Sequence, residues 1–294
     1  MERIGFIGLG AMGKPMTQNL MKAGYRLCVL TRTRSKIEDL LAAGARWCDT
    51  PKEIAEKSDV VITMLPDTPD VEQALAGANG VFEGARPGML IIDMSTVSPI
   101  AVRRLAREAE TRGCDFLDAP VSGGDIGAQK GTLSIMAGGR ESAFNRALPI
   151  FQALGKTILH MGDSGAGQIT KAANQILTSI HIEAVAEALA FAASAGVDPG
   201  KVRQALMGGS AYSRILEIHG QKMLERNFTP GFRMRLHRKD LDITLDAGRA
   251  YGAALPVTGQ VRDLMTETLN DGQGDMDNSS LILLIEKLSK AQGK

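Results

Sequence analysis

Residues 4 to 16 constrain the fold of this chain more than any other stretch. They read IGFIGLGAMGKPM, an apolar run, then glycines at positions 8, 10 and 13, then a helix-like segment. In dinucleotide-binding folds the first such glycine allows a tight turn, the second lets a pyrophosphate approach, and the third allows close helix–strand packing. Free N–H groups at the helix start attract the phosphates. The stretch predicts a dinucleotide cradle formed by Gly8, Leu9, Gly10, Ala11, Met12 and Gly13, with a plain strand–turn–helix as the alternative.

The end of the next apolar run, Arg26–Leu30, bears on which dinucleotide binds. NAD-selective folds place an acidic residue here, which binds the ribose 2′-hydroxyl. This chain has Thr31, Arg32, Thr33 and Arg34 instead, and an arginine can pair with a 2′-phosphate. We therefore expect an NAD(P) cofactor with a preference for NADP. Two arginines in a solvated turn are the alternative.

Short apolar runs alternate with helix-like segments through the first half of the chain. Strands that are buried on both faces and alternate with helices predict a parallel sheet of βαβ units. The predicted strands are Arg3–Gly8, Arg26–Leu30, Val60–Leu65, Met89–Asp93, Asp115–Asp118, Thr132–Gly138 and Thr157–Met161. The helix-like segments between them include Pro15–Ala23, Ile37–Ala43 and Ile100–Arg112.

The pattern changes after Gly167. From Ile169 to Ser194 only Lys171, Glu183 and Glu187 are charged, which predicts a helix of about 40 Å with contacts on nearly every side. Amphipathic helical segments without strands follow, at Pro199–Met207, Lys239–Gly252, Pro256–Leu269 and Ser280–Ala291. The predicted fold class is α/β: a Rossmann-type dinucleotide-binding domain at 1–163 and an all-helical domain for substrate and oligomerisation at 164–294. A long helix at about 166–195 joins them.

Composition excludes several classes of partner. A formal net charge of +1 over 294 residues gives no electrostatic case for binding nucleic acid. The three cysteines are scattered without a CxxC pair, as in proteins of a reducing compartment. The N-terminal residues do not resemble a signal peptide, and no uncharged apolar stretch approaches the roughly 20 residues of a membrane span. We expect a cytoplasmic protein.

The stretch DAPVSGG, residues 118 to 124, follows a predicted strand and so belongs at the carboxyl edge of the sheet, where open α/β folds bind ligands. Ser122, Gly123 and Gly124 offer a hydroxyl and accessible backbone N–H groups, which suit a small carboxylate. Pro120 occupies the place of the glycine that a nucleophilic-serine elbow requires. A glycine turn without a ligand is the alternative.

The stretch GAGQITKAANQ, residues 165 to 175, opens the long helix. Lys171, Asn174, Thr178 and His181 form one polar stripe on an otherwise apolar helix. A lysine on a largely buried helix is costly unless it is paired or used, and burial lowers the pKa of such a lysine toward that of a general acid and base. Asn174 could orient the amine or the substrate. A structural ion pair is the alternative for Lys171, and we expect His181 to be packed and hydrogen-bonded.

The stretch FTPGFRMRLHRKDL, residues 228 to 241, combines aromatic, cationic and acidic residues just before a helix. Lys239 and Asp240 could reach a cofactor or active site, although charge runs are commonly solvated faces. The histidines at 160, 219 and 237 show no metal-ligand spacing, so we predict no metal.

Together these stretches, with DMSTVSP at residues 93 to 99, resemble the β-hydroxyacid dehydrogenases, and the motifs span nearly the whole chain in the family's order. The resemblance implies that Lys171 is the catalytic acid/base and that Ser122, Gly123 and Gly124 hold the substrate with help from Asn174. It also implies a homodimer or homotetramer joined largely through the helical halves. Further positions that it places at the site are Thr96 near the nicotinamide, Leu65, Pro66 and Lys239 at the cofactor, and Phe232 and Asp240 at the substrate.

The resemblance implies reduction of a small carboxylate-bearing aldehyde to a hydroxy acid. Gln175 stands where hydroxyisobutyrate-type members carry a second asparagine, and this favours tartronate semialdehyde as substrate and glycerate as product. Succinic semialdehyde, glyoxylate and methylmalonate semialdehyde remain alternatives. A 6-phosphogluconate enzyme fits less well, because the chain is short and lacks a separate cluster of cations. A dinucleotide-binding module without turnover is an alternative from a different class.

Overall fold

The computed structural model describes residues 1–292 and contains two compact units, Met1–Lys171 and Ala172–Lys294. Helix α9, Ala166–Ser194, runs without interruption from the first unit into the second. The domain boundary predicted at residues 163 and 164 stays a prediction.

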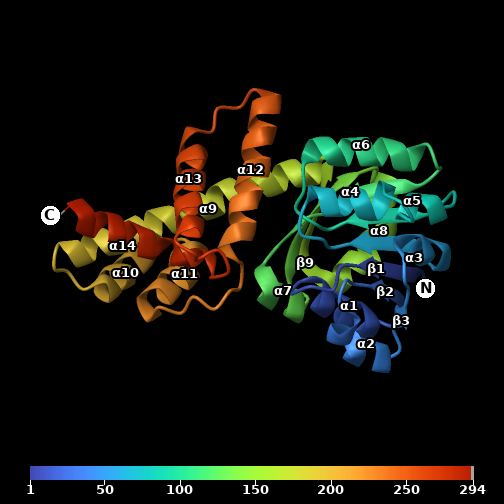
Figure 1. Cartoon of the computed structure of the whole chain (residues 1–294), viewed down its shortest axis with the longest axis horizontal. Helices are drawn as coiled ribbons and strands as arrows, with labels where there is room; N and C mark the ends of the chain where they lie inside the picture. Colours follow the sequence, from blue (N-terminus) through green and yellow to red (C-terminus); the bar gives the residue numbers. More distant parts are fainter. Residues whose placement is uncertain (293–294) are drawn as a thin grey trace. The chain divides into compact units, whose positions relative to one another are not determined.

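A nine-stranded sheet forms the centre of the first unit (Figure 1). Its strand order is β3-β2-β1-β4-β5-β6-β8-β7, and β9 also pairs with β8. The strands are β1 Arg3–Ile7, β2 Arg26–Leu30, β3 Arg46–Trp47, β4 Val60–Thr63, β5 Leu90–Asp93, β6 Asp115–Asp118, β7 Val121–Ser122, β8 Leu133–Gly139 and β9 Gly155–Gly162. The predicted α/β class is confirmed, and every predicted strand is present.

The sheet is not wholly parallel, which corrects the expectation of a parallel sheet. The six strands from β3 to β6 are parallel, whereas β8 runs antiparallel to both β6 and β7. The reason lies in the connection after β6. The short strand β7 and the short helix α7, Gly124–Lys130, return the chain to β8 without a complete crossover helix, so β8 enters beside β6 in the opposite direction.

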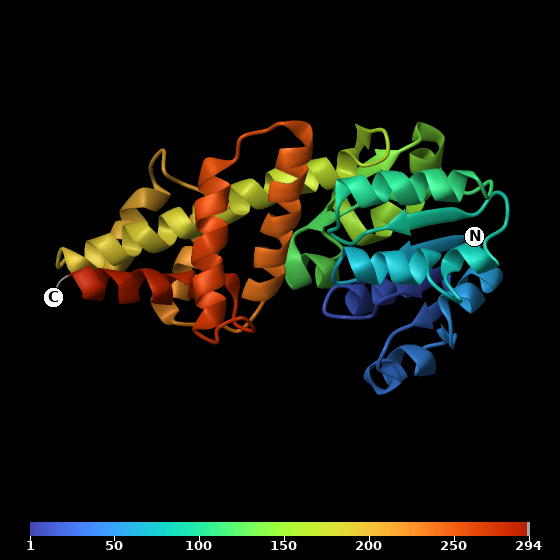
Figure 2. The ribbon, with the colours of Figure 1, turned by 45° about the horizontal axis from the view of Figure 1, so that its top comes forward.

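Helices cover both faces of this sheet (Figures 1 and 2). One buried cluster joins the sheet to α1, α2, α7 and α8, and a second joins it to α3, α4, α5 and α6. Three helices of the chain begin at a polar residue followed by proline, at Thr50, Ser98 and Asp198, where the side-chain oxygen accepts a backbone N–H. The helices are α1 Gly13–Lys22, α2 Glu38–Ala42, α3 Pro51–Lys57, α4 Thr68–Ala76, α5 Val81–Gly84, α6 Pro99–Glu110, α7 Gly124–Lys130 and α8 Glu141–Leu154, and a 3-10 turn covers Arg34–Ile37.

The second unit is helical, and its described residues contain no strand beyond one isolated bridge between Arg233 and Asp277. Ile182, Val185 and Leu189 of α9 contribute to its buried core. Figure 2 shows α12 and α13 lying side by side as a helical hairpin. The helices after α9 are α10 Pro199–Met207, α11 Arg214–Glu225, α12 Met234–Tyr251, α13 Pro256–Asn270 and α14 Leu281–Gln292, and a 3-10 turn covers Asn278–Ser280.

Helix α9 is only partly covered within this chain. Leu177 is 60% exposed and Phe191 is 77% exposed, so contacts within this chain do not enclose the helix, and the prediction of contacts on nearly every side stays a prediction. The low charge of the helix reflects an apolar stripe that this chain leaves open as well as a core-facing side. The helix is long and apolar enough to cross a membrane, with a mean hydropathy of 1.5 over an 18-residue window. Core helices of soluble proteins meet the same criteria, and one face of α9 lies in the core of the second unit.

Candidate active site

The three loop glycines differ in what surrounds them. Gly8 has a φ of +99°, and a Cβ there would lie 2.2 Å from the Met64 carbonyl oxygen. A Cβ on Gly13 would lie 1.9 Å from the Gly8 carbonyl oxygen, so the helix can approach β1 only without a side chain. A Cβ on Gly10 would meet nothing within 4 Å. The first and third glycines are therefore required by the fold, and the second leaves space beside the backbone.

That space fits a dinucleotide pyrophosphate. Gly10 leads into α1, whose first turn contains no acidic residue and has no side-chain cap on its N–H groups. Backbone N–H groups at the start of a helix bind phosphate through hydrogen bonds and the positive end of the helix dipole. The loop from Gly8 to Gly13 therefore suits the anion that the sequence predicts, and Leu9, Ala11 and Met12 lie within it.

The turn after β2 carries two exposed arginines, and they differ in their partners. The Arg32 side chain is 81% exposed, and its guanidinium lies 3.8 Å from an Asp70 carboxylate oxygen. The Arg34 guanidinium instead lies over the Trp47 ring, 5.4 Å from its centroid. Thr31 and Thr33 flank Arg32 in this turn. Arg32 can turn toward a phosphate because an ion pair as exposed and as long as this one costs little to break.

Side chains at the carboxyl ends of β4 and β5 form one hydrogen-bonded group. The Thr63 hydroxyl donates to Asp93 at 2.8 Å, and the Ser95 N–H donates to the same carboxylate oxygen at 3.1 Å. The Ser95 hydroxyl in turn accepts the Leu65 N–H at 2.9 Å. This group links the segment that contains Leu65 and Pro66 to the segment that contains Thr96.

Asp118, at the end of β6, holds the start of α9. Its carboxylate accepts the N–H of Gly165 at 2.7 Å and the N–H of Gln168 at 2.8 Å, and the side chain is fully buried. Burial raises the pKa of Asp118 to about 7, against the opposing effect of these two backbone donors. An anionic or polar oxygen is stabilised at the N-terminus of a helix, so Asp118 acts as a cap from a different element. This role of Asp118 was not predicted from the sequence.

Gln168 makes a second attachment between α9 and the sheet edge. Its side-chain amide accepts the Val97 N–H at 3.1 Å and donates to the Ser95 carbonyl at 2.8 Å. These two bonds enclose the backbone of Thr96. Lys171 follows Gln168 by three residues, close to one turn of the helix, and is 7% exposed. The predicted residues Lys171 and Thr96 therefore belong to segments that Gln168 joins.

The segment Ser122–Gly124 forms a strand end and a turn. Ser122 pairs with Ser134 in the antiparallel ladder of β7 and β8. Gly123 and Gly124 have φ values of +130° and +63°, which favour glycine, and a Cβ on Gly124 would meet nothing within 4 Å. The backbone of Gly124 is therefore open to a small ligand, as the prediction of a carboxylate site requires.

In the second unit, four predicted or neighbouring residues form a chain of contacts. The Lys239 ammonium lies 2.8 Å from one oxygen of Asp240, and the other oxygen accepts the Gln175 amide NH₂ at 2.6 Å. The Gln175 carbonyl oxygen accepts the Asn174 NH₂ at 2.8 Å. Gln175 and Asp240 are each 2% exposed, so these contacts are shielded from water.

The loop that carries Phe232 is held by a buried carboxylate. Asp277 accepts the N–H groups of Gly231 at 2.8 Å and of Phe232 at 3.3 Å, and the Lys222 ammonium at 2.8 Å. Burial alone would raise the pKa of Asp277, but the bonds from Lys222 and Ser279 outweigh it and hold the pKa below its ordinary value. Asp277 is not among the predicted site residues, although it lies in the distinctive stretch DGQGDMDNSS, residues 271 to 280.

One expectation about the polar stripe on α9 is wrong. His181 is exposed rather than packed, because it lies on the open side of the helix with Leu177. Among residues 1–292, no three His, Cys, Asp or Glu side chains are grouped in a way that could hold a metal ion. The three cysteines are free and buried.

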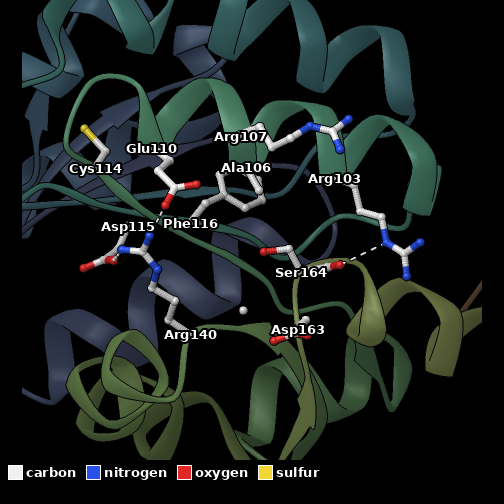
Figure 3. A pocket seen from close by; sticks show the side chains of 11 residues that line it. Arg103, Ala106, Arg107, Glu110, Cys114, Asp115, Phe116, Arg140, Asp163 and Ser164 are labelled. Carbon is white, nitrogen blue, oxygen red and sulfur yellow. Dashed lines mark hydrogen bonds and ion pairs between the residues drawn. The ribbon is translucent and has the colours of Figure 1, made fainter.

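A cavity of about 310 Å³ lies beside α6, and it does not contain the predicted site (Figure 3). Three arginines and three carboxylates line it, so it carries no net charge. Arg140 forms ion pairs there with Glu110 and Asp115. None of the predicted catalytic or binding residues lies in its wall.

Comparison with known proteins assigns both halves of the chain. A family model described as the NAD binding domain of 6-phosphogluconate dehydrogenase matches residues 3–162. A second, described as the NAD-binding domain of NADP-dependent 3-hydroxyisobutyrate dehydrogenase, matches residues 165–285.

Individual relatives extend over nearly the whole chain. It is 48% identical over 287 residues to a 2-hydroxy-3-oxopropionate reductase of Escherichia coli, covering 98% of both chains. It is 36% identical to a 2-(hydroxymethyl)glutarate dehydrogenase of Eubacterium barkeri, covering 98% of this chain and 96% of the relative. The solved structure of Mycobacterium tuberculosis 3-hydroxyisobutyrate dehydrogenase with L-serine is similar, with a TM-score of 0.88 at 33% identity, covering 97% and 99% of the two chains.

Proposed function

The chain belongs to the β-hydroxyacid dehydrogenase family, and from this premise we propose that it reduces tartronate semialdehyde to glycerate. The family assignment makes it an NAD(P)-dependent oxidoreductase that acts on small hydroxy acids or the matching aldehydes. Tartronate semialdehyde is 2-hydroxy-3-oxopropionate, the compound for which the 48% identical relative is named. That likeness supports the choice of substrate.

We propose that the nicotinamide dinucleotide is held by residues of both units. They are Gly8 to Gly13, Thr31 to Thr33, Leu65, Pro66, Thr96 and Lys239. When bound, the nicotinamide supplies the hydride that reduces the aldehyde carbon. The open backbone at Gly10 and the uncapped first turn of α1 support pyrophosphate binding there. The exposed Arg32 and the absence of an acidic residue at positions 31 to 34 support a preference for NADP.

Lys171 is the proposed general acid. Its ammonium gives a proton to the carbonyl oxygen as negative charge develops there, and the amine takes the proton back in the reverse reaction. The observation that carries this proposal is a lysine 7% exposed, about one turn beyond the Gln168 attachment that joins α9 to the carboxyl ends of the strands.

The substrate carboxylate is proposed to bind at Ser122, Gly123 and Gly124. Asn174 is proposed to assist at the aldehyde end of the substrate. Phe232 and Asp240 are proposed to border the substrate. The exposed backbone at Gly124 supports the carboxylate site, because open N–H groups suit an anion of this size.

The decisive test compares NADH and NADPH oxidation with tartronate semialdehyde, glyoxylate and succinic semialdehyde. Tartronate semialdehyde is expected to give the highest kcat/KM. A higher kcat/KM for another aldehyde acid would reassign the substrate within the family. Tight cofactor binding without oxidation by any of the three would favour a binding module instead.

Lys171→Ala tests the acid. We expect kcat to fall by about 10²- to 10⁴-fold, while the Kd for NADPH, measured by fluorescence, changes by less than about threefold. Lys171→Arg serves as the matched control, because it keeps the charge but does not release a proton at neutral pH, and it is expected to be similarly inactive. A wild-type rate in either variant would remove Lys171 from the mechanism.

We also propose that the protein is a cytoplasmic homo-oligomer whose copies cover the open stripe of α9. The exposed Leu177 and Phe191 support this, since large apolar side chains in a row along a helix are unfavourable in water. Free cysteines at all three positions support a reducing compartment.

A further inference from the structure

We infer that Gln168 is a positioning residue for the reduction, because its side-chain amide fixes Lys171 relative to the segment Ser95–Val97 that follows β5. This rests on the proposed function, in which Lys171 gives the proton and Thr96 lies near the nicotinamide. It goes beyond that function by naming the contact that keeps the proton donor and the cofactor segment in one relative placement.

The partners of the Gln168 amide determine which way it is turned. The Val97 N–H can only donate, so the atom that it meets at 3.1 Å is the Gln168 carbonyl oxygen. The Ser95 carbonyl can only accept, so the atom that it meets at 2.8 Å is the Gln168 NH₂ group. The two bonds enclose the backbone of one residue, Thr96, as a paired strand would. A side chain at position 168 needs a donor and an acceptor together to make both bonds.

The segment that Gln168 meets is itself attached to the sheet. The Ser95 N–H donates to Asp93 at 3.1 Å, and the Ser95 hydroxyl accepts the Leu65 N–H at 2.9 Å. Gln168 therefore binds a backbone that is held in place from β4 and β5. Bonds to such a backbone can hold the first turns of α9 in a defined position.

Gln168 adds a constraint that the cap at Asp118 does not provide. Asp118 accepts the N–H groups of Gly165 and Gln168, so it holds the end of α9 at β6. A helix held only at its end can still pivot there. The side chain of Gln168 reaches the loop after β5, which gives α9 a second attachment at a neighbouring strand. Lys171 lies about 4.5 Å further along the helix and about 60° around it from Gln168, so a pivot of the helix would displace the ammonium.

Close backbone packing limits the movement of this first turn further. A Cβ on Gly167 would lie 2.3 Å from the Met136 carbonyl oxygen and 2.5 Å from the Asp118 carbonyl oxygen. A Cβ on Gly138 would lie 2.8 Å from the Gly167 nitrogen. The backbone of α9 therefore packs directly on the backbone of the sheet. Gln168 is 2% exposed, so water does not compete for its two bonds.

Two variants of Gln168 test the inference with tartronate semialdehyde and NADPH. Gln168→Met keeps the length of the side chain but makes neither bond. Gln168→Glu is milder, because its carboxylate can still accept the Val97 N–H but cannot donate to the Ser95 carbonyl. We expect kcat to fall by about 10- to 100-fold, since small misplacements of a reacting group cost this much. KM and the Kd for NADPH should stay within about threefold of wild type.

Arg203→Met is the matched control for a loss of stability. The Arg203 guanidinium also makes two bonds to a distant backbone, to the carbonyls of Leu216 at 3.2 Å and Glu217 at 2.7 Å. These bonds join α10 to α11, and neither helix carries a proposed site residue. The control should unfold at lower denaturant concentration than wild type, with kcat within about twofold of the wild-type value.

A double variant tests whether Gln168 acts through Lys171. If it does, Gln168→Met should lower kcat by less than about threefold when Lys171 is already alanine, because the group that it positions is gone. A loss of 10- to 100-fold that persists in the Lys171→Ala background would overturn the inference. So would a kcat within about twofold of wild type in both single variants of Gln168, and either result would leave the proposed function intact.

The proposed function is tested by enzymes with Gln168 unchanged. If wild type reduces no aldehyde acid, or if Lys171→Ala keeps the wild-type rate, the proposed function fails and the inference fails with it. The Kd for NADPH, measured in every variant, identifies any variant that does not fold.

Discussion

At the scale of single residues, the proposed cofactor site would recognise phosphate in two ways, through the backbone at Gly10 and through the side chain of Arg32. At Gly10 the absence of a side chain exposes backbone N–H groups, and this recognition is the same for every dinucleotide. At Arg32 an exposed cation lies at the position where NAD-selective folds have an acidic residue that binds the ribose hydroxyl. We propose that the first feature determines whether a dinucleotide binds and that the second determines which dinucleotide is preferred.

Arg32→Ala should lower the ratio of kcat/KM for NADPH to that for NADH by about 10- to 100-fold, because a charge-assisted bond to the 2′-phosphate is lost. Steady-state kinetics with both cofactors measures this ratio. Arg34→Ala is the matched control. Its guanidinium packs on Trp47, so the ratio should stay within about threefold of wild type. Equal changes in both variants would show that the turn provides only general positive charge.

At the scale of elements, the attachment of α9 to the end of β6 depends on one carboxyl group. Asp118 is buried, and its pKa is raised to about 7, above the ordinary value of 3.8. The folded protein therefore holds this proton at pH values where the unfolded chain has lost it. The stabilisation is complete below the unfolded pKa and is lost as the pH rises toward the folded value.

Asp118→Asn should make this dependence visible in chemical unfolding. The amide keeps one acceptor oxygen and leaves one helix N–H without its partner, so we expect the variant to unfold with about 1–3 kcal/mol less free energy near pH 5. The difference in unfolding free energy between wild type and variant should become smaller as the pH rises to about 8. Only wild type has a carboxyl group at this position, and it loses the stabilisation that comes from holding its proton. A gap that does not change with pH would show that Asp118 does not titrate as described. If the variant has a lower kcat but an unchanged Kd for NADPH, the result would indicate that the Asp118 cap positions the segment of α9 that carries Lys171.

Elements with a strong local pattern were predictable, and those set by distant partners were not. The buried strands and the long helix follow from runs of apolar residues. Pro199–Met207 was predicted to the residue as an amphipathic segment, and in the structure this helix begins at the Asp198 cap and Pro199. The direction of β8 depends on what pairs beside it, and β7 has only two residues, too few for a periodic signal. The attachments made by Asp118, Gln168 and Asp277 join segments 46 to 73 residues apart, which no local pattern reports.

At the scale of the whole molecule, the open stripe of α9 bears on how copies of the chain would assemble. A helix with little charge was expected to be enclosed, yet Leu177 and Phe191 face outward within this chain. The low charge of α9 and the exposure of these two side chains are consistent with each other if a second copy of the chain packs against them. The apolar residues of α9 would then be buried in the oligomer, although some of them are exposed in a single chain.

Phe191→Arg combined with Leu177→Arg should shift the protein toward the monomer, because two charges replace apolar area that an interface would bury. Sedimentation velocity or light scattering measures the change in mass. Leu288→Arg is the matched control, since Leu288 is an exposed leucine at 45% on α14, and it should leave the mass unchanged. A double variant with the mass of wild type would place the contact elsewhere.

The continuity of α9 also limits how such a protein could have been assembled during evolution. Its 29 residues contribute to both compact units, and its interior holds no proline or flexible connector. If a gene fusion had joined two independently folding domains through a flexible linker, we would expect such a linker between the two units rather than a continuous helix. Any exchange of one half for that of a relative must preserve the helical phase, since one inserted residue rotates everything beyond it by about 100°. Viable chimaeras should therefore have their junctions outside this helix or at aligned positions within it.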